Sequence, residues 1–169
     1  MKYHRASIRL NGYNYSENGC YFVTICADHR GNVFGETVGA RRDAPLVDKK
    51  IKLNQNGKII ENIWKTLPDH NNVILDEFII MPDHIHFILM INNNLLINKG
   101  ASRRAPTHLG FIIGIFKTEC TKQINKLNET PGIKIFQRNY YERIIRNEKE
   151  YFVIKKYIKD NPKKFKSFF

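Results

Sequence analysis

Two histidines one residue apart, His84 and His86, are the residues whose types and spacing most directly suggest chemistry. They open an apolar run, 84–91, with the composition of a buried strand. Because side chains alternate along a strand, both imidazoles are predicted on one face, with Ile85 and Phe87 on the other. Imidazole is a common metal ligand, so the pair predicts part of a metal site. A purely structural role is the alternative.

The histidine pair does not resemble a closed structural zinc site. Neither cysteine-based nor His-Glu-His zinc spacing is present in the sequence. Two imidazoles with one oxygen ligand would leave positions open to a phosphate oxygen. Such a site suits Mg²⁺ or Mn²⁺ acting as a Lewis acid on a phosphodiester.

A candidate nucleophile lies in the helix predicted to open at Asn147. Tyr157 and Asn161 stand at positions i and i+4 of this helix, at the edge of its apolar stripe. A tyrosine there can act as a covalent nucleophile on a phosphate held in line, and the amide can offer its oxygen to a metal. Spacing alone favours the alternative, in which Tyr157 is a rim aromatic and Asn161 a helix-end residue before Pro162.

The remaining elements follow from periodicity and turn residues. Strands are predicted where β-branched and aromatic residues run together, at 20–27, 33–34, 73–81, 84–91, 133–136 and 140–145. Helical spacing predicts three helices, of which the first is 54–67, ended by Pro68. The second is capped by Thr107, and its apolar side carries Leu109, Ile112, Ile113, Phe116 and Cys120. The third begins with an Asn147–Glu150 capping box, has an apolar stripe of Tyr151, Ile154 and Ile158, and ends at Pro162. This order predicts an α+β, ferredoxin-like βαββαβ fold with an antiparallel sheet and an additional C-terminal helix carrying the nucleophile.

Length and composition predict one domain over residues 1–169, since 169 residues with 42% apolar side chains can bury a real core. Cys20, Cys26 and Cys120 are scattered and odd in number, which is typical of reduced thiols in a cytoplasmic protein. There is no apolar run of about 20 residues and no apolar signal core near Met1, so we expect neither a membrane span nor secretion.

The charge indicates a polyanionic partner. Lys and Arg number 28 against 16 acids, for a net charge of +12, and nucleic acid is the commonest such partner. A basic surface kept for solubility is the alternative. The C-terminal tail, 151–169, interleaves lysines with aromatic residues, as expected for neutralising phosphates and stacking bases of a single strand. The tail lysines predicted to contact DNA include Lys155, Lys156, Lys159, Lys163 and Lys164.

Two arginine pairs occur in a loose near-repeat. Arg41 and Arg42 lie within 39–45, and Arg103 and Arg104 lie within 100–106. Both stretches fall between predicted elements and are expected to be exposed loops. Either the pairs grip a DNA backbone, or the similarity is linker composition repeated by chance.

Three segments together resemble the REP-associated tyrosine transposases of the HUH superfamily of single-strand DNA nucleases. These are 81–86 (Met-Pro-Asp-His-Ile-His), 136–150 (Phe-Gln-Arg-Asn-Tyr-Tyr-Glu-Arg-Ile-Ile-Arg-Asn-Glu-Lys-Glu) and 157–162 (Tyr-Ile-Lys-Asp-Asn-Pro). The stretches 9–13, 21–25 and 113–117 are also similar to that family, so the resemblance covers nearly the whole chain.

The resemblance implies roles for particular residues. His84 and His86 would be the histidines of the HUH motif, Asn161 the third ligand of Mg²⁺ or Mn²⁺, and Tyr157 the nucleophile that forms a 5′-phosphotyrosine link and releases a 3′-hydroxyl. Strand joining would reverse this step. The expected partner is single-stranded or hairpin DNA, the expected location is cytoplasmic and nucleoid-associated, and the protein would act as a monomer or homodimer.

The same resemblance bears on several other side chains. Lys117 and Arg138, within the matching segments, are also expected to contact DNA. Tyr140, Tyr141 and Tyr151 compete with Tyr157 for the role of nucleophile but lack an amide at i+4 followed by proline. We therefore expect them to be packing or DNA-contact residues. The two arginine loops depart from the family's usual pattern, which leaves target-site recognition open.

Two other functions fit parts of the pattern. A histidine-triad nucleotide hydrolase also has two histidines in this spacing, but it needs another at position 88, which is Ile88 here. A catalytically inactive nucleic-acid-binding module of ferredoxin-like fold would share the architecture and the basic charge. Such a module would place aromatic residues, rather than histidines, in the middle of its strands.

Overall fold

The computed structural model describes residues 18–39, 49–70, 73–92 and 109–165, which form two antiparallel sheets and three helices. The larger sheet contains β1 (Gly19–Cys26), β4 (Val73–Ile80), β5 (His84–Ile91) and β6 (Tyr141–Ile145). The smaller sheet pairs β2 (Gly35–Val38) with β3 (Lys50–Leu53). The helices are α1 (Gln55–His70), α2 (Leu109–Asn128) and α3 (Glu148–Lys164). No helix in these ranges is long and apolar enough to cross a membrane.

The larger sheet confirms the predicted ferredoxin-like architecture. Its strand order is β4-β5-β1-β6, and each neighbouring pair is antiparallel. One helix follows β1 and one follows β5, as the βαββαβ pattern requires. The β2–β3 pair is inserted between β1 and α1, and α3 is the additional C-terminal helix. The prediction of one domain over residues 1–169 stays a prediction.

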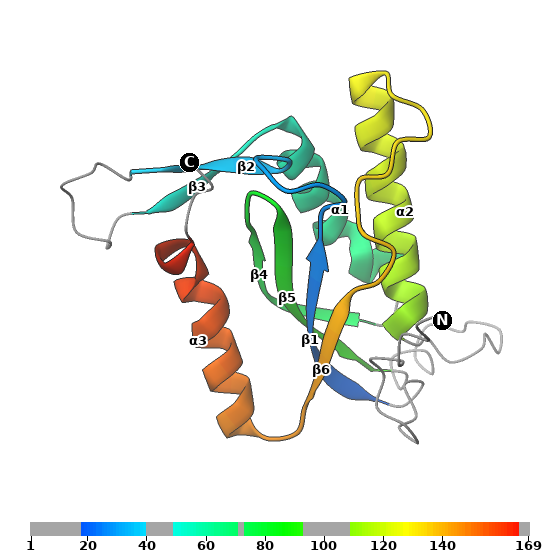
Figure 1. Cartoon of the computed structure of the whole chain (residues 1–169). Helices are drawn as coiled ribbons and strands as arrows, with labels where there is room; N and C mark the ends of the chain where they lie inside the picture. The colour runs from blue at the N-terminus through cyan, green and yellow to red at the C-terminus, as the bar shows by residue number, and fades with distance from the viewer. Residues whose placement is uncertain (1–17, 40–48, 71–72, 93–108, 166–169) are drawn as a thin grey trace, which may run out of the picture.

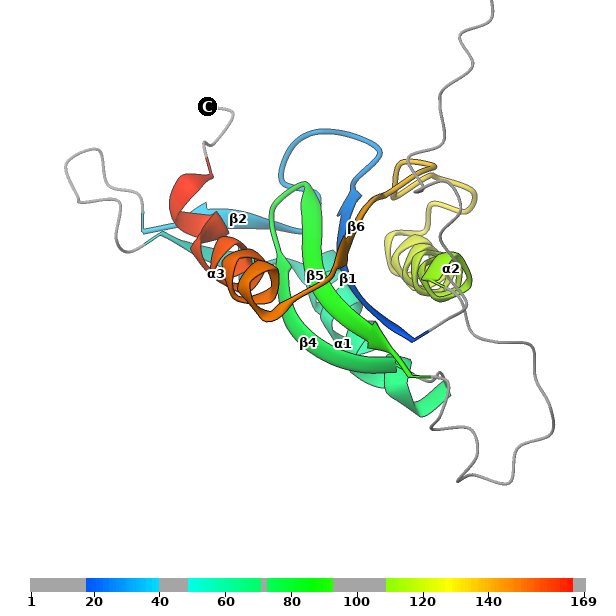
Figure 2. The same cartoon turned by 90° about the horizontal axis from the view of Figure 1, so that it is seen from below.

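The two faces of the larger sheet carry different layers (Figures 1 and 2). On one face, α1 and α2 enclose the main apolar core, in which the indole of Trp64 stacks on Phe78 with ring centroids 4.6 Å apart. Ile85, Phe87 and Leu89 point into this core, as their alternation predicted. The other face carries α3 over a smaller apolar cluster, and it is also the face of the two histidines.

Two expectations about strands are wrong. Residues 33–34 do not form a return strand on β1. Instead Phe34 is fully buried and its amide donates to Pro82 O at 2.9 Å, so the next strand begins at Gly35 and pairs with β3. The stretch 133–136 is likewise no strand, because only an isolated bridge from Phe136 to Ala27 forms there.

Both helix ends placed at prolines are wrong as well. α1 continues through Pro68 to His70, and α3 continues through Pro162 to Lys164. A proline near the last turn removes one backbone donor, which is not enough to stop the helix at that residue. The predicted cap at Thr107 lies outside the described residues, whereas the apolar side of α2 is buried as predicted.

The start of α3 is fixed by the predicted capping pair. Asn147 accepts a hydrogen bond from the Glu150 amide at 2.9 Å, and Glu150 accepts one from the Arg146 amide at 3.0 Å. Two amide donors at the helix start are thus satisfied by side chains. Hydrogen bonds of this kind set the residue at which the helix begins, and therefore the position of every side chain along it.

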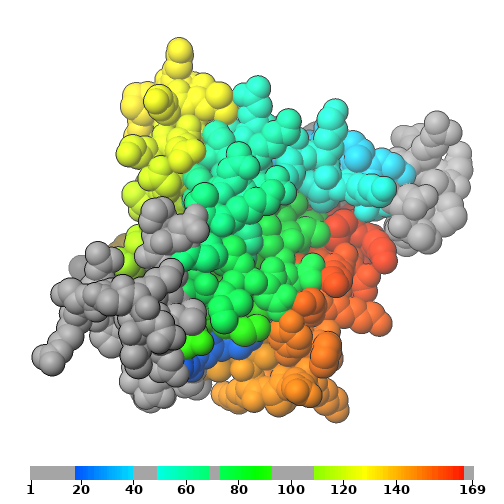
Figure 3. All heavy atoms as spheres, turned by 180° about the vertical axis from the view of Figure 1, so that it is seen from behind, coloured from blue at the N-terminus to red at the C-terminus, as the bar shows by residue number. Residues whose placement is uncertain are grey.

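α3 packs on β4 and β5 through Ile154 and Ile158, which are buried against Phe22 and Ile88 (Figure 1). Viewed from behind, the atoms of α3 meet those of β4 along one edge of the molecule (Figure 3). Apolar contact holds the helix on the sheet but is non-directional. A second set of contacts fixes its position along the strand.

That second set arises from a β-bulge in β4. The pairing with β5 shifts between Leu75 and Phe78, so Asp76 and Glu77 together stand opposite one residue. Asp76 accepts hydrogen bonds from the Tyr151 hydroxyl and from Lys155 Nζ, the latter at 2.6 Å. Glu77 forms an ion pair with Lys159 Nζ at 3.4 Å. We call Asp76 and Glu77 the bulge carboxylates; they bind three successive turns of α3.

The charge on Asp76 is stabilised by this helix. Burial raises the pKa of Asp76, but the hydrogen bonds from Lys155 and Tyr151 outweigh that effect and hold its pKa below its ordinary value of 3.8. A carboxyl group with a lowered pKa contributes stability above its unfolded-state pKa. The contribution is lost as the pH falls through the folded-state pKa.

We expect Asp76→Asn to lower the free energy of unfolding at pH 7 by about 1–2 kcal/mol, since it weakens hydrogen bonds to a charged group. The difference from the unsubstituted protein should shrink as the pH falls from about 4 through the lower folded-state pKa, because Asp76 then becomes protonated in the folded state as well as in the unfolded state. Urea unfolding at pH 7 and at a pH below the folded-state pKa of Asp76 measures this difference in the free energy of unfolding. Asp160→Asn, which removes an exposed partner of Lys163, is the matched control and should cost much less. Equal losses for the two variants would show that the bulge does not anchor α3.

Candidate active site

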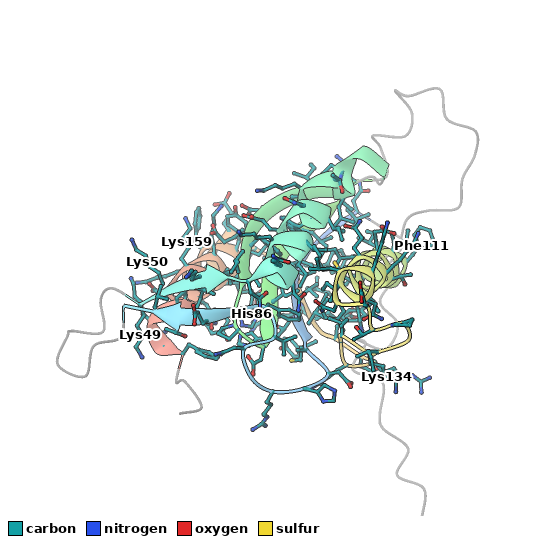
Figure 4. The ribbon with its side chains drawn as sticks, turned by 90° about the horizontal axis from the view of Figure 1, so that it is seen from above. Lys49, Lys50, His86, Phe111, Lys134 and Lys159 are labelled. Atoms are coloured by element: carbon teal, nitrogen blue, oxygen red, sulfur yellow. The ribbon has the colours of Figure 1, made fainter. Side chains whose placement is uncertain are left out.

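His84 and His86 lie on one face of β5, with ring centroids 4.6 Å apart. His84 directly follows the turn at Pro82 and Asp83, which two backbone hydrogen bonds fix. Ala27 donates its amide to Asp83 O at 2.8 Å, and Met81 donates its amide to His84 O at 2.8 Å. The pair is therefore held by strand pairing and by a tied turn, and Figure 4 shows His86 in the middle of the molecule. The prediction that both imidazoles share a face is confirmed.

In each ring the Nδ1 atom is already engaged. His84 Nδ1 lies 2.7 Å from Asp83 Oδ1, and His86 Nδ1 lies 2.8 Å from Thr24 Oγ1. A carboxylate only accepts hydrogen bonds, so Nδ1 of His84 carries the proton. Its Nε2 is then the atom with a lone pair for a metal, the usual arrangement of a histidine ligand with a partner behind it. Nδ1 of His86 is likewise occupied, but by the Thr24 hydroxyl, which can either accept or donate a hydrogen bond.

His86 is 5% exposed. Burial, with a smaller effect from the neighbouring His84, lowers the pKa of His86 from 6.5 to about 3. The ring is therefore neutral at physiological pH, which is the form that binds metals. The ring of Phe22 stacks on it with centroids 5.5 Å apart and excludes water from one side.

Tyr157 of α3 and Phe165, the residue that caps the end of this helix, lie against the histidine pair. The ring of Tyr157 contacts the ring of His86, with centroids 5.4 Å apart, and the ring of Phe165 lies 6.1 Å from that of His84. Asn161 lies midway between Tyr157 and Phe165, four residues from each, so all three share one side of the helix. Asn161 is 8% exposed, one of three buried polar residues in the described part of the chain. The helix thus carries a buried amide between its two contacts with the histidines.

These groups fit an oxygen-preferring divalent ion. The donor set is two imidazole Nε2 atoms and one amide oxygen, with further positions for water or substrate oxygens. Across the described ranges, no group of three His, Cys, Asp or Glu side chains is arranged to hold a metal. The amide of Asn161, buried on α3 one turn after Tyr157, is a candidate for a third ligand.

Tyr157 differs from the other candidate tyrosines in its surroundings. It is 43% exposed, and its ring contacts His86, so the side chain is partly open to solvent beside the histidines. Tyr151, by contrast, has its hydroxyl bound to Asp76, and the pKa of Tyr151 is raised chiefly by that hydrogen bond. Tyr151 therefore serves to anchor α3.

The predicted DNA-contact residues have varied surroundings. Lys155, Lys159 and Lys163 are ion-paired with acids of this chain, whereas Lys156 and Lys164 form no ion pair within the described ranges. Figure 4 shows Lys49, Lys50 and Lys159 gathered on the α3 side of the molecule. The remaining predicted contacts among the described residues are Lys117 on α2 and Arg138 in the segment that leads into β6.

Lys117 and Arg138 lie together there. Lys117 Nζ donates to the carbonyls of Gln137 and Arg138, and burial lowers the pKa of Lys117. Lys117 therefore ties α2 to this segment, while the Arg138 side chain is exposed. Four predicted contacts, Arg41, Arg42, Arg103 and Arg104, lie outside the described residues. A role in binding DNA stays a prediction for the whole set.

Sequence reasoning assigned no role to Thr24 or Phe22, and it placed Phe165 only among the tail aromatics expected to stack on bases; all three contact the histidine pair. The only signal for Thr24 was a polar side chain within an apolar strand, which alternation places on the histidine face. No sequence signal locates Phe165, because its contact depends on where α3 ends.

Comparison of the sequence with known proteins identifies a relative. No family model matches the chain. A protein of Haemophilus influenzae, described as an uncharacterized protein, is 35% identical over 175 residues, which is 95% of this chain and 89% of that protein. The chain belongs to the same family as that protein.

This chain shares the fold of a solved transposase. A structure of a REP-associated tyrosine transposase bound to a REP hairpin matches with a TM-score of 0.54 and 17% identity, covering 91% of this chain and 72% of that one. A crystal structure of a putative transposase from Deinococcus radiodurans matches with a TM-score of 0.47 and 16% identity, covering 90% of this chain and 95% of that one. The first of these two matches shows that the fold is of the transposase kind.

We expect the protein to bind one Mn²⁺ per chain near neutral pH, measured by isothermal titration calorimetry. His84→Ala and His86→Ala should each weaken binding at least tenfold, since each removes a ligand. Asn161→Ala should weaken it similarly, and Asn161→Asp should retain it, because a carboxylate oxygen suits Mn²⁺.

His29→Ala is the control, since His29 is an exposed histidine that pairs with Asp28 away from the site. It should leave Mn²⁺ affinity unchanged. Unchanged affinity in Asn161→Ala, alongside loss in His84→Ala, would rule out Asn161 as the third ligand.

Proposed function

We propose that this chain is a REP-associated tyrosine transposase of the HUH superfamily, an enzyme that cuts and rejoins single-stranded DNA. The observation that carries the proposal is the contact between Tyr157 and His86, with ring centroids 5.4 Å apart, on a helix that also carries buried Asn161. Metal-assisted attack on a phosphodiester needs a nucleophile and a set of groups that can hold the metal. Tyr157 is the candidate nucleophile, and the two imidazoles and the Asn161 amide are the candidate metal-binding groups.

In the proposed site, His84, His86 and Asn161 would hold Mg²⁺ or Mn²⁺. The ion would supply Lewis-acid polarisation of the scissile phosphate. The Tyr157 hydroxyl gives up its proton and its oxygen bonds to phosphorus as the bond from phosphorus to the 3′ oxygen breaks. The departing 3′ oxygen takes up a proton, so the products are a 5′-phosphotyrosine and a 3′-hydroxyl. The bond energy is kept in the phosphotyrosine, so a 3′-hydroxyl can reverse the step and join strands.

Several features of the chain support a DNA substrate. The net charge is +12, and lysines gather on the side of the molecule where α3 lies (Figure 4). The structurally similar transposase is bound to a DNA hairpin, and we extend a hairpin-forming substrate to this chain. A cytoplasmic, nucleoid-associated location would follow from that substrate.

All the proposed groups come from one chain. The histidines are on β5 and the tyrosine and amide on α3, and the bulge carboxylates hold that helix on its own sheet. We therefore propose that a single copy holds a full set of catalytic groups, whether the protein acts as a monomer or as a homodimer.

Neither alternative accounts for this arrangement as well. A histidine-triad hydrolase needs a histidine at 88, and Ile88 is fully buried in the apolar cluster under α3. A catalytically inactive binding module would not require Tyr157 beside His86. The inactive binding module is the alternative that an assay for a covalent protein–DNA adduct distinguishes from a nuclease.

We expect a covalent protein–DNA adduct, stable to SDS, when the protein is incubated with Mn²⁺ and labelled DNA hairpins that carry single-stranded flanks of randomised sequence. Tyr157→Phe should abolish the adduct because it removes the attacking oxygen, and His84→Ala should reduce it at least a hundredfold. Gel electrophoresis under denaturing conditions measures both.

Tyr140→Phe is the matched control and should retain the adduct. Hairpin binding without any adduct in the unsubstituted protein would favour the inactive binding module. An adduct that survives in Tyr157→Phe would assign the nucleophile to another residue.

A further inference from the structure

The histidine face of the sheet extends beyond the site, across β1 to β6. Tyr141 on β6 pairs with Thr24 on β1, which pairs in turn with His86 on β5. Residues directly opposite in neighbouring strands point to the same face. The Thr24–His86 contact of 2.8 Å confirms this for one step of the row. Tyr141 therefore stands on the same face as the histidines, two strands away.

Tyr141 is 52% exposed, which is unusual for an aromatic side chain in the middle layer of a fold. Its exposure follows from the position of α3, which packs over β4 and β5 and leaves the β6 side of this face without a covering helix in the described ranges (Figure 2). The structure thus keeps a large aromatic ring at the surface beside the candidate site.

Phe22 links this ring to the site. The ring of Phe22 is buried and contacts both Tyr141 and Tyr157, with centroid separations of 6.3 and 6.0 Å. It also stacks on His86. We call Phe22, Tyr141 and Tyr157 the aromatic shelf: one buried ring flanked by two partly exposed rings.

The positive charge of Arg143, next to the aromatic shelf, is already neutralised by an acid of this chain. Arg143, two residues along β6 and on the same face, forms an ion pair with Glu150 of α3 at 2.8 Å. This pair spans from β6 to the first turn of the helix. A phosphate would have to displace Glu150 to use Arg143, whereas the flat face of a base needs only an aromatic ring. The shelf is therefore better suited to a base than to a phosphate.

We propose that Tyr141 is a stacking platform for a base of single-stranded DNA adjacent to the bond that Tyr157 attacks. The proposal deepens the proposed function and rests on it for the identity of that bond. Stacking is sequence-tolerant because every base has a π face, so the platform positions the strand without reading its sequence.

The test measures binding without cleavage. Fluorescence anisotropy of a labelled (dT)20 oligonucleotide is followed in the Tyr157→Phe background, where no adduct can form. Adding Tyr141→Leu should weaken binding about tenfold, since a leucine keeps apolar bulk but offers no ring. Tyr141→Phe should bind within about twofold of the parent. The dependence of affinity on salt should be the same in all of them, because no phosphate contact is lost.

Phe111→Leu is the matched control: it removes another half-exposed aromatic ring, on α2, which lies on the opposite side of the molecule from Lys159 of α3 (Figure 4). It should leave affinity unchanged. In a second measurement, (dT)20 with one 5-iododeoxyuridine is irradiated and the crosslinked peptide is identified by mass spectrometry. The expected peptide contains Tyr141.

Three results would overturn the platform: no binding of (dT)20 by the parent, equal binding by the parent and Tyr141→Leu, or an equal loss in Phe111→Leu. These results are separable from failure of the proposed function. Loss of binding in Tyr141→Leu, together with no adduct in the unsubstituted protein, would leave the platform standing and remove the nuclease.

Discussion

The attachment of α3 to the sheet is the constraint on which the candidate site depends. The two histidines are fixed by β5 and its turn, but they can form an active site only if α3 places Tyr157 and Asn161 beside them. Apolar burial of Ile154 and Ile158 brings the helix to the sheet, and apolar contact tolerates sliding. The bulge carboxylates remove that freedom, because each is directed at a different turn of the helix.

The charged and polar groups on the histidine face of the larger sheet differ from one region to the next. At the histidines, burial keeps His86 neutral, while Asp83 and Thr24 occupy the Nδ1 atoms and leave Nε2 available. Under α3, acids and lysines cancel one another and serve structure. At β6, Arg143 is neutralised by Glu150, and the ring of Tyr141 is exposed. Two residues of one type on α3 therefore have different surroundings: the Tyr151 hydroxyl is bound to Asp76, whereas the ring of Tyr157 is partly exposed beside His86.

Much of this could be predicted from the sequence because it depends on local periodicity. The alternation around His84 and His86, the apolar side of α2 and the capping pair at Asn147 are properties of short segments, and the structure confirms each. The helix ends at Pro68 and Pro162 were wrong because packing over a whole helix outweighs one missing donor. The position of Tyr157 beside His86 depends on a bulge about eighty residues earlier in the chain. No local pattern in α3 shows that bulge, which is why spacing alone did not favour Tyr157 as a nucleophile.

The most direct test of the central claim is a crystal structure of the protein grown with Mn²⁺, with the ion located by its anomalous scattering. The account predicts one peak within about 2.3 Å of Nε2 of His84, Nε2 of His86 and the side-chain oxygen of Asn161, with the Tyr157 hydroxyl facing the open side of the ion. A peak bound through Nδ1 atoms or Asp83, with Asn161 turned away, would contradict it.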